Sequence, residues 1–263
     1  MKALFIGYGR MGGALGDAWL QAGLVEELFI VDPALPGDSK SRRFTRLNDL
    51  PDMGFDLIIL AVKPAYASSA MAELRDSHCQ NATVLSVVAG VTHATLFHAL
   101  KQRCPVVRVM PNTPVLVGAG CTGLFAGSLL DDSHKDLIGR LFSAVGSAWW
   151  VECEQQLDAV TAISGSGPAY YHLFSEALAQ AGIKLGLPKD LARHLAAQTA
   201  FGAAKLQQQP LADFAQLRIA VTSPNGTTAA AIEVFESEQK LRQLIEQATA
   251  AAYRRSVELS ANP

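Results

Sequence analysis

The residues most clearly suited to chemistry are three glycines that follow an apolar segment at the N-terminus. Gly7, Gly9 and Gly12 form the pattern G-x-G-x-x-G, directly after the apolar run Ala3–Ile6. In a strand–turn–helix unit, the first glycine permits a tight turn, the second leaves room for a pyrophosphate, and the third lets helix and strand pack closely. The phosphates then lie at the positive end of a helix. The predicted dinucleotide contacts are Gly7, Tyr8, Gly9, Arg10, Met11 and Gly12.

An acidic residue at the end of the second predicted strand bears on which dinucleotide binds. Asp32 follows Gly12 by 20 residues, the place of a carboxylate that binds the adenosine ribose of NAD(H) and repels the 2′-phosphate of NADP(H). A basic cluster then follows at Ser39, Lys40, Arg42 and Arg43. These side chains either fold back to hold that phosphate or belong to an ordinary solvated loop, so both cofactors stay open.

Two further loops follow predicted strands, at the edge of an open sheet where ligands bind. One is Ala61–Pro64, in which Lys63 is placed at the cleft and Pro64 starts a helix. The other is Met110–Pro114, in which Asn112 is suited to hydrogen-bond the nicotinamide amide or ribose. Spacing alone does not separate either from a plain connection. The first loop contributes Ala61, Val62, Lys63 and Pro64 to the predicted cofactor site.

Two polar, glycine-rich segments precede helical runs in the second half of the chain. They are Ser164–Tyr170 and Val221–Thr228. Each offers hydroxyls and free backbone N–H groups at a helix N-terminus, which is an anion site. Plain N-capping is the alternative for each, but two such segments in one small domain favour a carboxylate pocket. Ser164 and Ser166 are therefore predicted substrate contacts.

The elements that position these residues fall into two classes. Apolar runs and helix-like stretches alternate up to about residue 150, which predicts a parallel sheet covered by helices on both faces. Beyond Ser164 the pattern contains helices only. We therefore predict an α/β Rossmann-type N-terminal domain, residues 1–160, followed by an all-α C-terminal substrate-binding and dimerisation domain, residues 161–263. The predicted strands are Ala3–Ile6, Leu28–Val31, Leu57–Val62, Thr83–Val88, Val106–Met110 and Ala148–Val151.

Composition narrows the classes of function. The net charge of −2 over 263 residues provides no basic field for nucleic acid. No apolar run reaches the ~18–20 residues of a membrane span, and the first apolar run leads straight into the glycine motif rather than a cleavage site. The four cysteines form no C-x-x-C pair, so we expect reduced thiols, no metal and a cytoplasmic location. Helices rich in alanine and glycine, such as AAQTAFGAAK, favour a homodimer over a single compact helical domain.

Six motifs after the glycine turn carry a resemblance to a known family. VKP, VRVMPNTP, SGSGPAYY, LGLP, QTAFGAAKL and VTSPNGTT occur in this order and resemble those of the pyrroline-5-carboxylate reductases over nearly the whole chain. The resemblance implies reduction of 1-pyrroline-5-carboxylate to L-proline, the last step of proline biosynthesis, with NADP(H) or NAD(H). It also implies a homodimer that in several members assembles into larger rings.

Carried over by motif, the resemblance adds residues to both predicted sites. Ala89 and Gly90 resemble a cofactor loop. Ser223, Gly226, Thr227 and Thr228 resemble the contacts to the substrate carboxylate and ring nitrogen, with Thr228 and Ser223 as the catalytic pair.

The chain departs from the family pattern at three positions. Asn225 stands where a glycine is usual, and asparagine tolerates the left-handed backbone better than most residues. Ala220 stands where many members have asparagine, and Asp32 is not the ending expected of a strict NADPH binder.

The chemistry of an imine fits these residues. A protonated C=N bond is already electrophilic, so the protein needs to hold the ring, exclude water and orient the nitrogen. Thr228 is a poor acid and suits orientation and proton relay. A β-hydroxyacid dehydrogenase, the nearest alternative, resembles G-x-G-x-x-x-K at this point, and here no lysine follows Gly165 and Gly167 at that spacing. Another imine reductase and a non-catalytic NAD(P)-sensing protein are the further alternatives.

Overall fold

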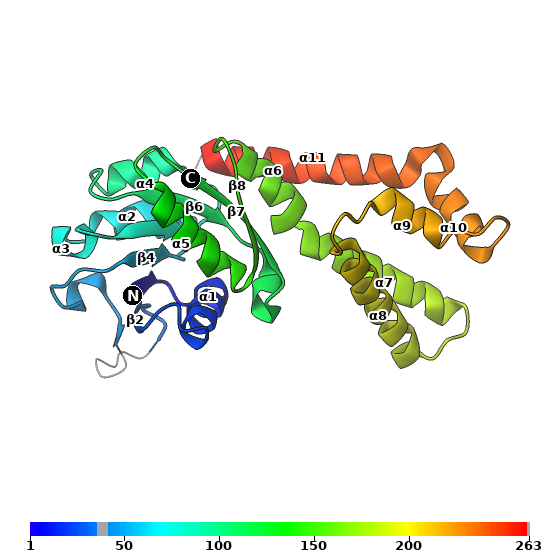
Figure 1. Ribbon diagram of the computed structural model, residues 1–263, viewed down its shortest axis with the longest axis horizontal. Helices are drawn as coiled ribbons and strands as arrows, with labels where there is room; N and C mark the ends of the chain where they lie inside the picture. Colours follow the sequence, from blue (N-terminus) through cyan, green and yellow to red (C-terminus); the bar gives the residue numbers. More distant parts are fainter. Residues whose placement is uncertain (36–41, 262–263) are drawn as a thin grey trace. The chain divides into compact units, whose positions relative to one another are not determined.

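The apolar segments of the first half form one sheet in the computed structural model, which describes residues 1–35 and 42–261 (Figure 1). The strand order is β3-β2-β1-β4-β5-β6-β7-β8, and all neighbouring pairs are parallel except β6 and β7. The strands are β1 (Lys2–Ile6), β2 (Glu27–Val31), β3 (Arg43–Phe44), β4 (Leu57–Leu60), β5 (Thr83–Ser86), β6 (Val106–Met110), β7 (Gly120–Ala126) and β8 (Gly146–Trp150).

The sheet predicted from the sequence is found to be parallel apart from one antiparallel pair, β6 with β7, and the sequence analysis missed both β3 and β7. Nine residues, 111–119, connect β6 to β7. A parallel pair needs a crossover of about a dozen residues or more, so this shorter connection favours an antiparallel neighbour.

Two apolar cores, one on each face, hold the sheet between helices. The alternation along β1 shows how the faces separate, because Leu4 packs in one core and Phe5 in the other. The Trp19 indole on α1 donates to the Leu141 carbonyl on α5 at 2.7 Å, inside the second core. The helices of this part are α1 (Arg10–Gln21), α2 (Ala67–Ala72), α3 (Asp76–Cys79), α4 (His93–Ala99), α5 (Asp132–Ser143) and α6 (Gln156–Val160).

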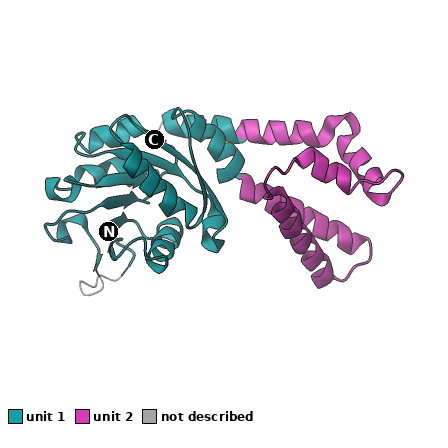
Figure 2. Ribbon diagram, viewed as in Figure 1, with its two compact units in different colours: residues 1–166, 252–263 teal, residues 167–251 magenta. Residues whose placement is uncertain are grey.

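The chain divides into two compact units (Figure 2). Unit 1 comprises Met1–Ser166 with Ala252–Pro263, and unit 2 comprises Gly167–Ala251. The C-terminal end of the last helix thus groups with the sheet, whereas the sequence interpretation assigned all of residues 161–263 to the helical domain.

The described residues of unit 2 are helical, with no strand among them. Among the described residues, none of the helices combines the length and the apolar character that a membrane crossing requires. The helices are α7 (Gly167–Lys184), α8 (Lys189–Gln207), α9 (Phe214–Ala220), α10 (Thr227–Glu236) and the first part of α11 (Lys240–Ala261).

Candidate active site

The glycine turn between β1 and α1 is packed so closely that two of its glycines admit no side chain. Gly7 has a φ of +88°, and a Cβ there would lie 2.5 Å from the Ala61 carbonyl oxygen. A Cβ on Gly12 would lie 2.5 Å from the Gly7 carbonyl oxygen. The turn therefore lies directly against the carboxyl end of β4, as the sequence motif predicts.

Gly9, in contrast to Gly7 and Gly12, faces open space. It is the N-cap of α1, and a Cβ built on it would meet nothing within 4 Å. No side chain caps the first turn of α1, so its N–H groups remain available to an anion. The open space above Gly9 and these amides fit the pyrophosphate of a dinucleotide.

Asp32 is held against this turn by the backbone. One carboxylate oxygen accepts a hydrogen bond from the Tyr8 N–H at 2.7 Å, and the other accepts from the Ala34 N–H at 2.9 Å. The carboxylate is thereby fixed at the carboxyl end of β2, beside the predicted phosphate cradle. Two members of the predicted basic cluster, Ser39 and Lys40, lie outside the described residues.

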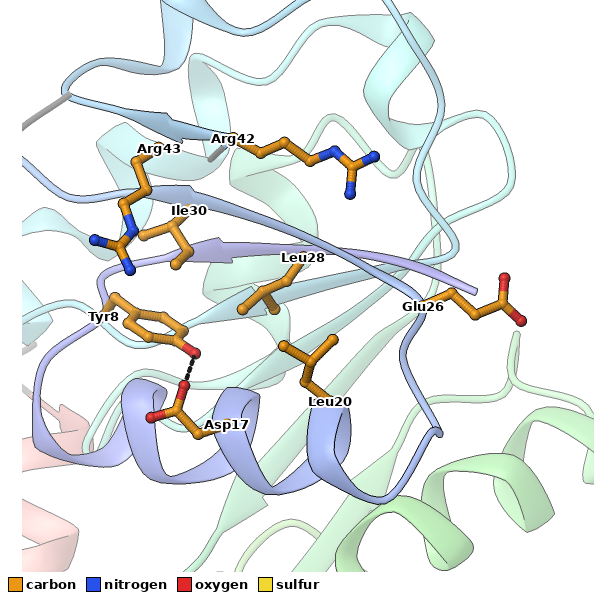
Figure 3. Close-up of a pocket in the computed structure, with 8 residues that line it drawn as sticks. All are labelled: Tyr8, Asp17, Leu20, Glu26, Leu28, Ile30, Arg42 and Arg43. Carbon is orange, nitrogen blue, oxygen red and sulfur yellow. Dashed lines mark hydrogen bonds between the residues drawn. The ribbon is translucent and has the colours of Figure 1, made fainter. Parts of the chain in front are cut away.

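The side chain of Tyr8 locks the turn to α1, a role that the sequence interpretation missed. Its hydroxyl donates to Asp17 at 2.7 Å (Figure 3), and its ring meets Phe5 edge-on with centroids 5.4 Å apart. Burial, with the Asp17 carboxylate adding to its effect, raises the pKa of Tyr8, so the hydroxyl stays a donor at neutral pH. A signal was present in the sequence, because Gly13 and Gly16 on α1 leave room for the ring.

Adding a methyl group at Gly16 tests this packing. A Cβ there would lie 2.5 Å from the Tyr8 hydroxyl oxygen. We expect Gly16→Ala to lower the free energy of unfolding by about 1 kcal/mol, because overpacking outweighs the better helix propensity of alanine. Gly139→Ala, at an open position of α5, should instead raise it by about 0.5–1 kcal/mol. Urea unfolding measures both, and equal signs would contradict the placement of the Tyr8 ring.

The other predicted cofactor loops lie at the ends of the neighbouring strands. The Ala61 N–H donates to the Ile6 carbonyl at 2.8 Å, which joins the loop after β4 to the end of β1. Lys63 is exposed and occupies the N-cap position of the short helix that Pro64 begins, without a capping hydrogen bond from its side chain. Gly90 follows β5 with a φ of +75°, and a Cβ there would lie 3.0 Å from the Leu259 carbonyl oxygen.

The side-chain amide of Asn112 makes hydrogen bonds within the protein. It is buried at the end of β6, its side-chain amide nitrogen donates to the Ser164 carbonyl at 3.0 Å, and its oxygen accepts from the Cys121 N–H at 2.8 Å. This amide therefore connects the loop after β6 to Ser164, the first residue of the polar, glycine-rich segment Ser164–Tyr170. Its contact with the nicotinamide stays a prediction.

A π-turn at Thr161–Gly165 leads into the polar, glycine-rich segment Ser164–Tyr170. The Ser166 N–H donates to the Thr161 carbonyl at 2.8 Å, and the Ser164 hydroxyl donates back to the Val160 carbonyl at 3.0 Å. Single π-turns inside helices often occur at functional sites. The predicted contacts of Ser164 and Ser166 with a substrate stay predictions.

In unit 2, a tight turn leads into the N-terminus of α10. Asn225 adopts the left-handed region with a φ of +59°, as predicted for asparagine in place of glycine. The Gly226 N–H donates to the Ser223 carbonyl at 3.0 Å, and the Ser223 hydroxyl occupies the space that a Cβ on Gly226 would need.

The first turn of α10 is suited to hold an anion. Gly226 is its N-cap, and no side chain caps this turn, so its N–H groups are available. Thr227 and Thr228 place hydroxyls at the same helix end. The arrangement brings amide and hydroxyl donors together, as binding of a small carboxylate requires.

Two family models match parts of this chain. Residues 154–259 match the family described as pyrroline-5-carboxylate reductase dimerisation, and residues 2–90 match the family described as NADP oxidoreductase, coenzyme F420-dependent. A pyrroline-5-carboxylate reductase of Pseudomonas aeruginosa is 44% identical over 205 residues, 78% of this chain and 75% of the relative. A pyrroline-5-carboxylate reductase of Haemophilus influenzae is 37% identical over 97% of this chain and 96% of the relative.

Solved structures give the same result. A pyrroline-5-carboxylate reductase from Coxiella burnetii superposes with a TM-score of 0.88 at 35% identity, over 98% of both chains. A Plasmodium falciparum pyrroline carboxylate reductase with NADP bound superposes with a TM-score of 0.86 at 29% identity, over 99% of this chain and 98% of that one.

Proposed function

The chain belongs to the pyrroline-5-carboxylate reductase family, and we propose that it reduces 1-pyrroline-5-carboxylate to L-proline with NAD(P)H. The observation that carries this proposal is the uncapped N-terminus of α1 at Gly9, open to a pyrophosphate beside the ends of β1, β2 and β4. The uncapped N-terminus of α10 in the other unit adds a donor set for the substrate carboxylate.

In this proposal, the residues of the chain bind the substrate and orient its ring, and none of them forms a covalent bond with it. A reduced nicotinamide bound to this chain would supply the hydride needed at the imine carbon. The amides of Gly226–Thr228 hold the carboxylate, and the Thr228 hydroxyl orients the ring nitrogen and relays its proton. Because the protonated imine is already electrophilic, this account needs no metal and no strong base.

An assay with three arms tests the proposal. We expect oxidation of NADPH or NADH with pyrroline-5-carboxylate and none with a β-hydroxyacid as the control. Tyr171 stands where the hydroxyacid dehydrogenase pattern has its lysine. Turnover of the hydroxyacid alone would support that alternative, and dinucleotide binding without any turnover would support a sensing protein.

The helical unit supports a homodimer. Many of its large apolar side chains are exposed in the single chain, which marks an association surface. We expect a dimer at micromolar concentration by sedimentation velocity, and a monomer there would refute this assignment. The larger ring of dimers and the cytoplasmic location stay predictions. The exposed residues include Tyr171, Leu173, Leu185, Phe201, Leu211, Phe214, Val234 and Leu244.

Asp32 governs the choice of cofactor in this account. Its fixed carboxylate accepts from the ribose hydroxyls and repels a 2′-phosphate, so Asp32→Ser should shift the kcat/KM ratio toward NADPH by roughly tenfold, about 1.4 kcal/mol. Steady-state kinetics with both cofactors measure this ratio. Asp136→Ser on the exposed side of α5 is the matched control. A ratio that Asp32→Ser leaves unmoved would mean that Asp32 does not face the ribose.

A further inference from the structure

The fixed carboxylate of Asp32 would repel the 2′-phosphate of NADPH. Binding of NADPH therefore requires a positively charged group close to this phosphate. Both oxygens of Asp32 are held by backbone N–H groups of Tyr8 and Ala34, so the carboxylate cannot swing away without breaking them. Like charges at close range cost affinity unless a positive group intervenes. The described members of the basic cluster are Arg42 and Arg43, and the structure distinguishes them.

The side chain of Arg42 contacts residues at the N-terminal part of β2, away from Asp32. Its guanidinium pairs with Glu27 at 2.8 Å and lies over the Phe29 ring, 5.2 Å from the centroid. Glu27 begins β2 and Asp32 follows its end, a separation of roughly 16 Å at the usual rise of a strand. Arg42 therefore does not serve a ligand at the carboxyl end of the sheet.

Arg43 lies at the cofactor end. It is the first residue of β3 and stands opposite Ile30 of β2, and the Asp32 N–H donates to the next residue, Phe44, at 3.0 Å. Its guanidinium lies beside the ring of Tyr8, close to the glycine turn, whereas that of Arg42 points the other way (Figure 3). Both arginines line a cavity of about 390 Å³ that extends along β2 and α1.

Within the described part of the chain, the charge of Arg43 acts on Tyr8, whose pKa it lowers against the larger opposing effects of burial and of Asp17. Arg43 belongs to none of the ion pairs found among the described residues, in contrast to Arg42, and its side chain is exposed. Its backbone is anchored in the sheet, so the position of the side chain relative to Asp32 is set by the β2–β3 register. A guanidinium in this position can present two parallel N–H donors to a phosphate.

We infer that Arg43 is the specificity-determining residue that binds the 2′-phosphate of NADP(H) and so offsets the repulsion by Asp32. The inference rests on the proposed function only for the use of a nicotinamide dinucleotide. With Arg43 in place the chain accepts both cofactors, and without it the chain becomes selective for NAD(H).

Two adenosine nucleotides isolate this contact without turnover. Adenosine 2′,5′-bisphosphate carries the additional phosphate, and adenosine 5′-monophosphate lacks it. By calorimetry, we expect Arg43→Ala to weaken binding of the bisphosphate by about tenfold or more and to leave binding of the monophosphate unchanged. Arg42→Ala is the matched control and should change neither. Intact monophosphate binding shows that the variant site is folded.

Kinetics with both cofactors complete the test. Arg43→Ala should lower kcat/KM for NADPH and not for NADH, and Arg43→Lys should retain part of the NADPH activity. Equal losses for both nucleotides, no loss for either, or the expected loss in Arg42→Ala would overturn the inference. Wild-type turnover with NADH is measured in the same series, and its absence would count against the proposed function and not against Arg43.

Discussion

Gly9→Val abolishes dinucleotide binding and leaves the protein folded. The valine side chain fills the open space in front of the α1 amides, where the pyrophosphate of the cofactor must approach the backbone. We expect the affinity for NAD⁺ and NADP⁺ to fall by at least ~100-fold, about 2.7 kcal/mol. Calorimetry measures the affinity, and circular dichroism with urea unfolding checks the fold.

The structure explains why the fold should survive this change. Gly9 has a φ of −73°, which any residue adopts, and a Cβ built there meets no protein atom within 4 Å. Gly139→Val on α5 is the control, because that position is also open but far along the chain from the turn. Normal dinucleotide affinity in the Gly9 variant would remove the glycine turn from the cofactor site.

Thr228→Ala lowers turnover far more than it weakens cofactor binding. Losing one positioned hydrogen bond to the ring nitrogen should cost about 1–3 kcal/mol in the transition state, which corresponds to roughly 5- to 150-fold in kcat. The predicted cofactor contacts belong to unit 1 and Thr228 belongs to unit 2, so we expect the dissociation constant of the dinucleotide not to change. Steady-state kinetics and calorimetry on the same preparation separate the two effects.

A conservative substitution shows whether the hydroxyl itself matters. Thr228→Ser keeps the donor at the start of α10 and should retain most of the wild-type rate. Thr249→Ala, which removes a hydroxyl that bonds back to the Ile245 carbonyl on α11, should leave kcat unchanged. If Thr228→Ala turned over at the wild-type rate, Thr228 would not belong to the site.

The strands that sequence reasoning found are those whose apolar runs are long and unbroken. β1 and β6 were predicted to within one residue at each end, because residues buried on both faces of a sheet leave continuous apolar runs. β3 was missed because it has only two residues, Arg43 and Phe44. β7 was missed because it contains Gly120 and Gly123 and carries few large apolar residues.

The candidate site shows the same contrast between local and distant information. The glycine turn and the left-handed Asn225 follow from the backbone needs of a few adjacent residues, so the sequence pattern was sufficient to predict them. The link between Asn112 and Ser164 joins residues 52 positions apart. The different contacts of Arg42 and Arg43 depend on the register in which β3 pairs with β2. Spacing carries no signal for contacts of this kind.

Transfer of a labelled hydride tests the central claim most directly. Pyrroline-5-carboxylate is incubated with the protein and with NADH dideuterated at C4 of the nicotinamide, so that either face delivers the label. The account predicts L-proline with one deuterium at the former imine carbon, the ring carbon next to the nitrogen that does not carry the carboxylate. Mass spectrometry detects this label, and the Gly9→Val protein should give no labelled product. Proline without deuterium, or no proline despite consumption of NADH, would contradict it.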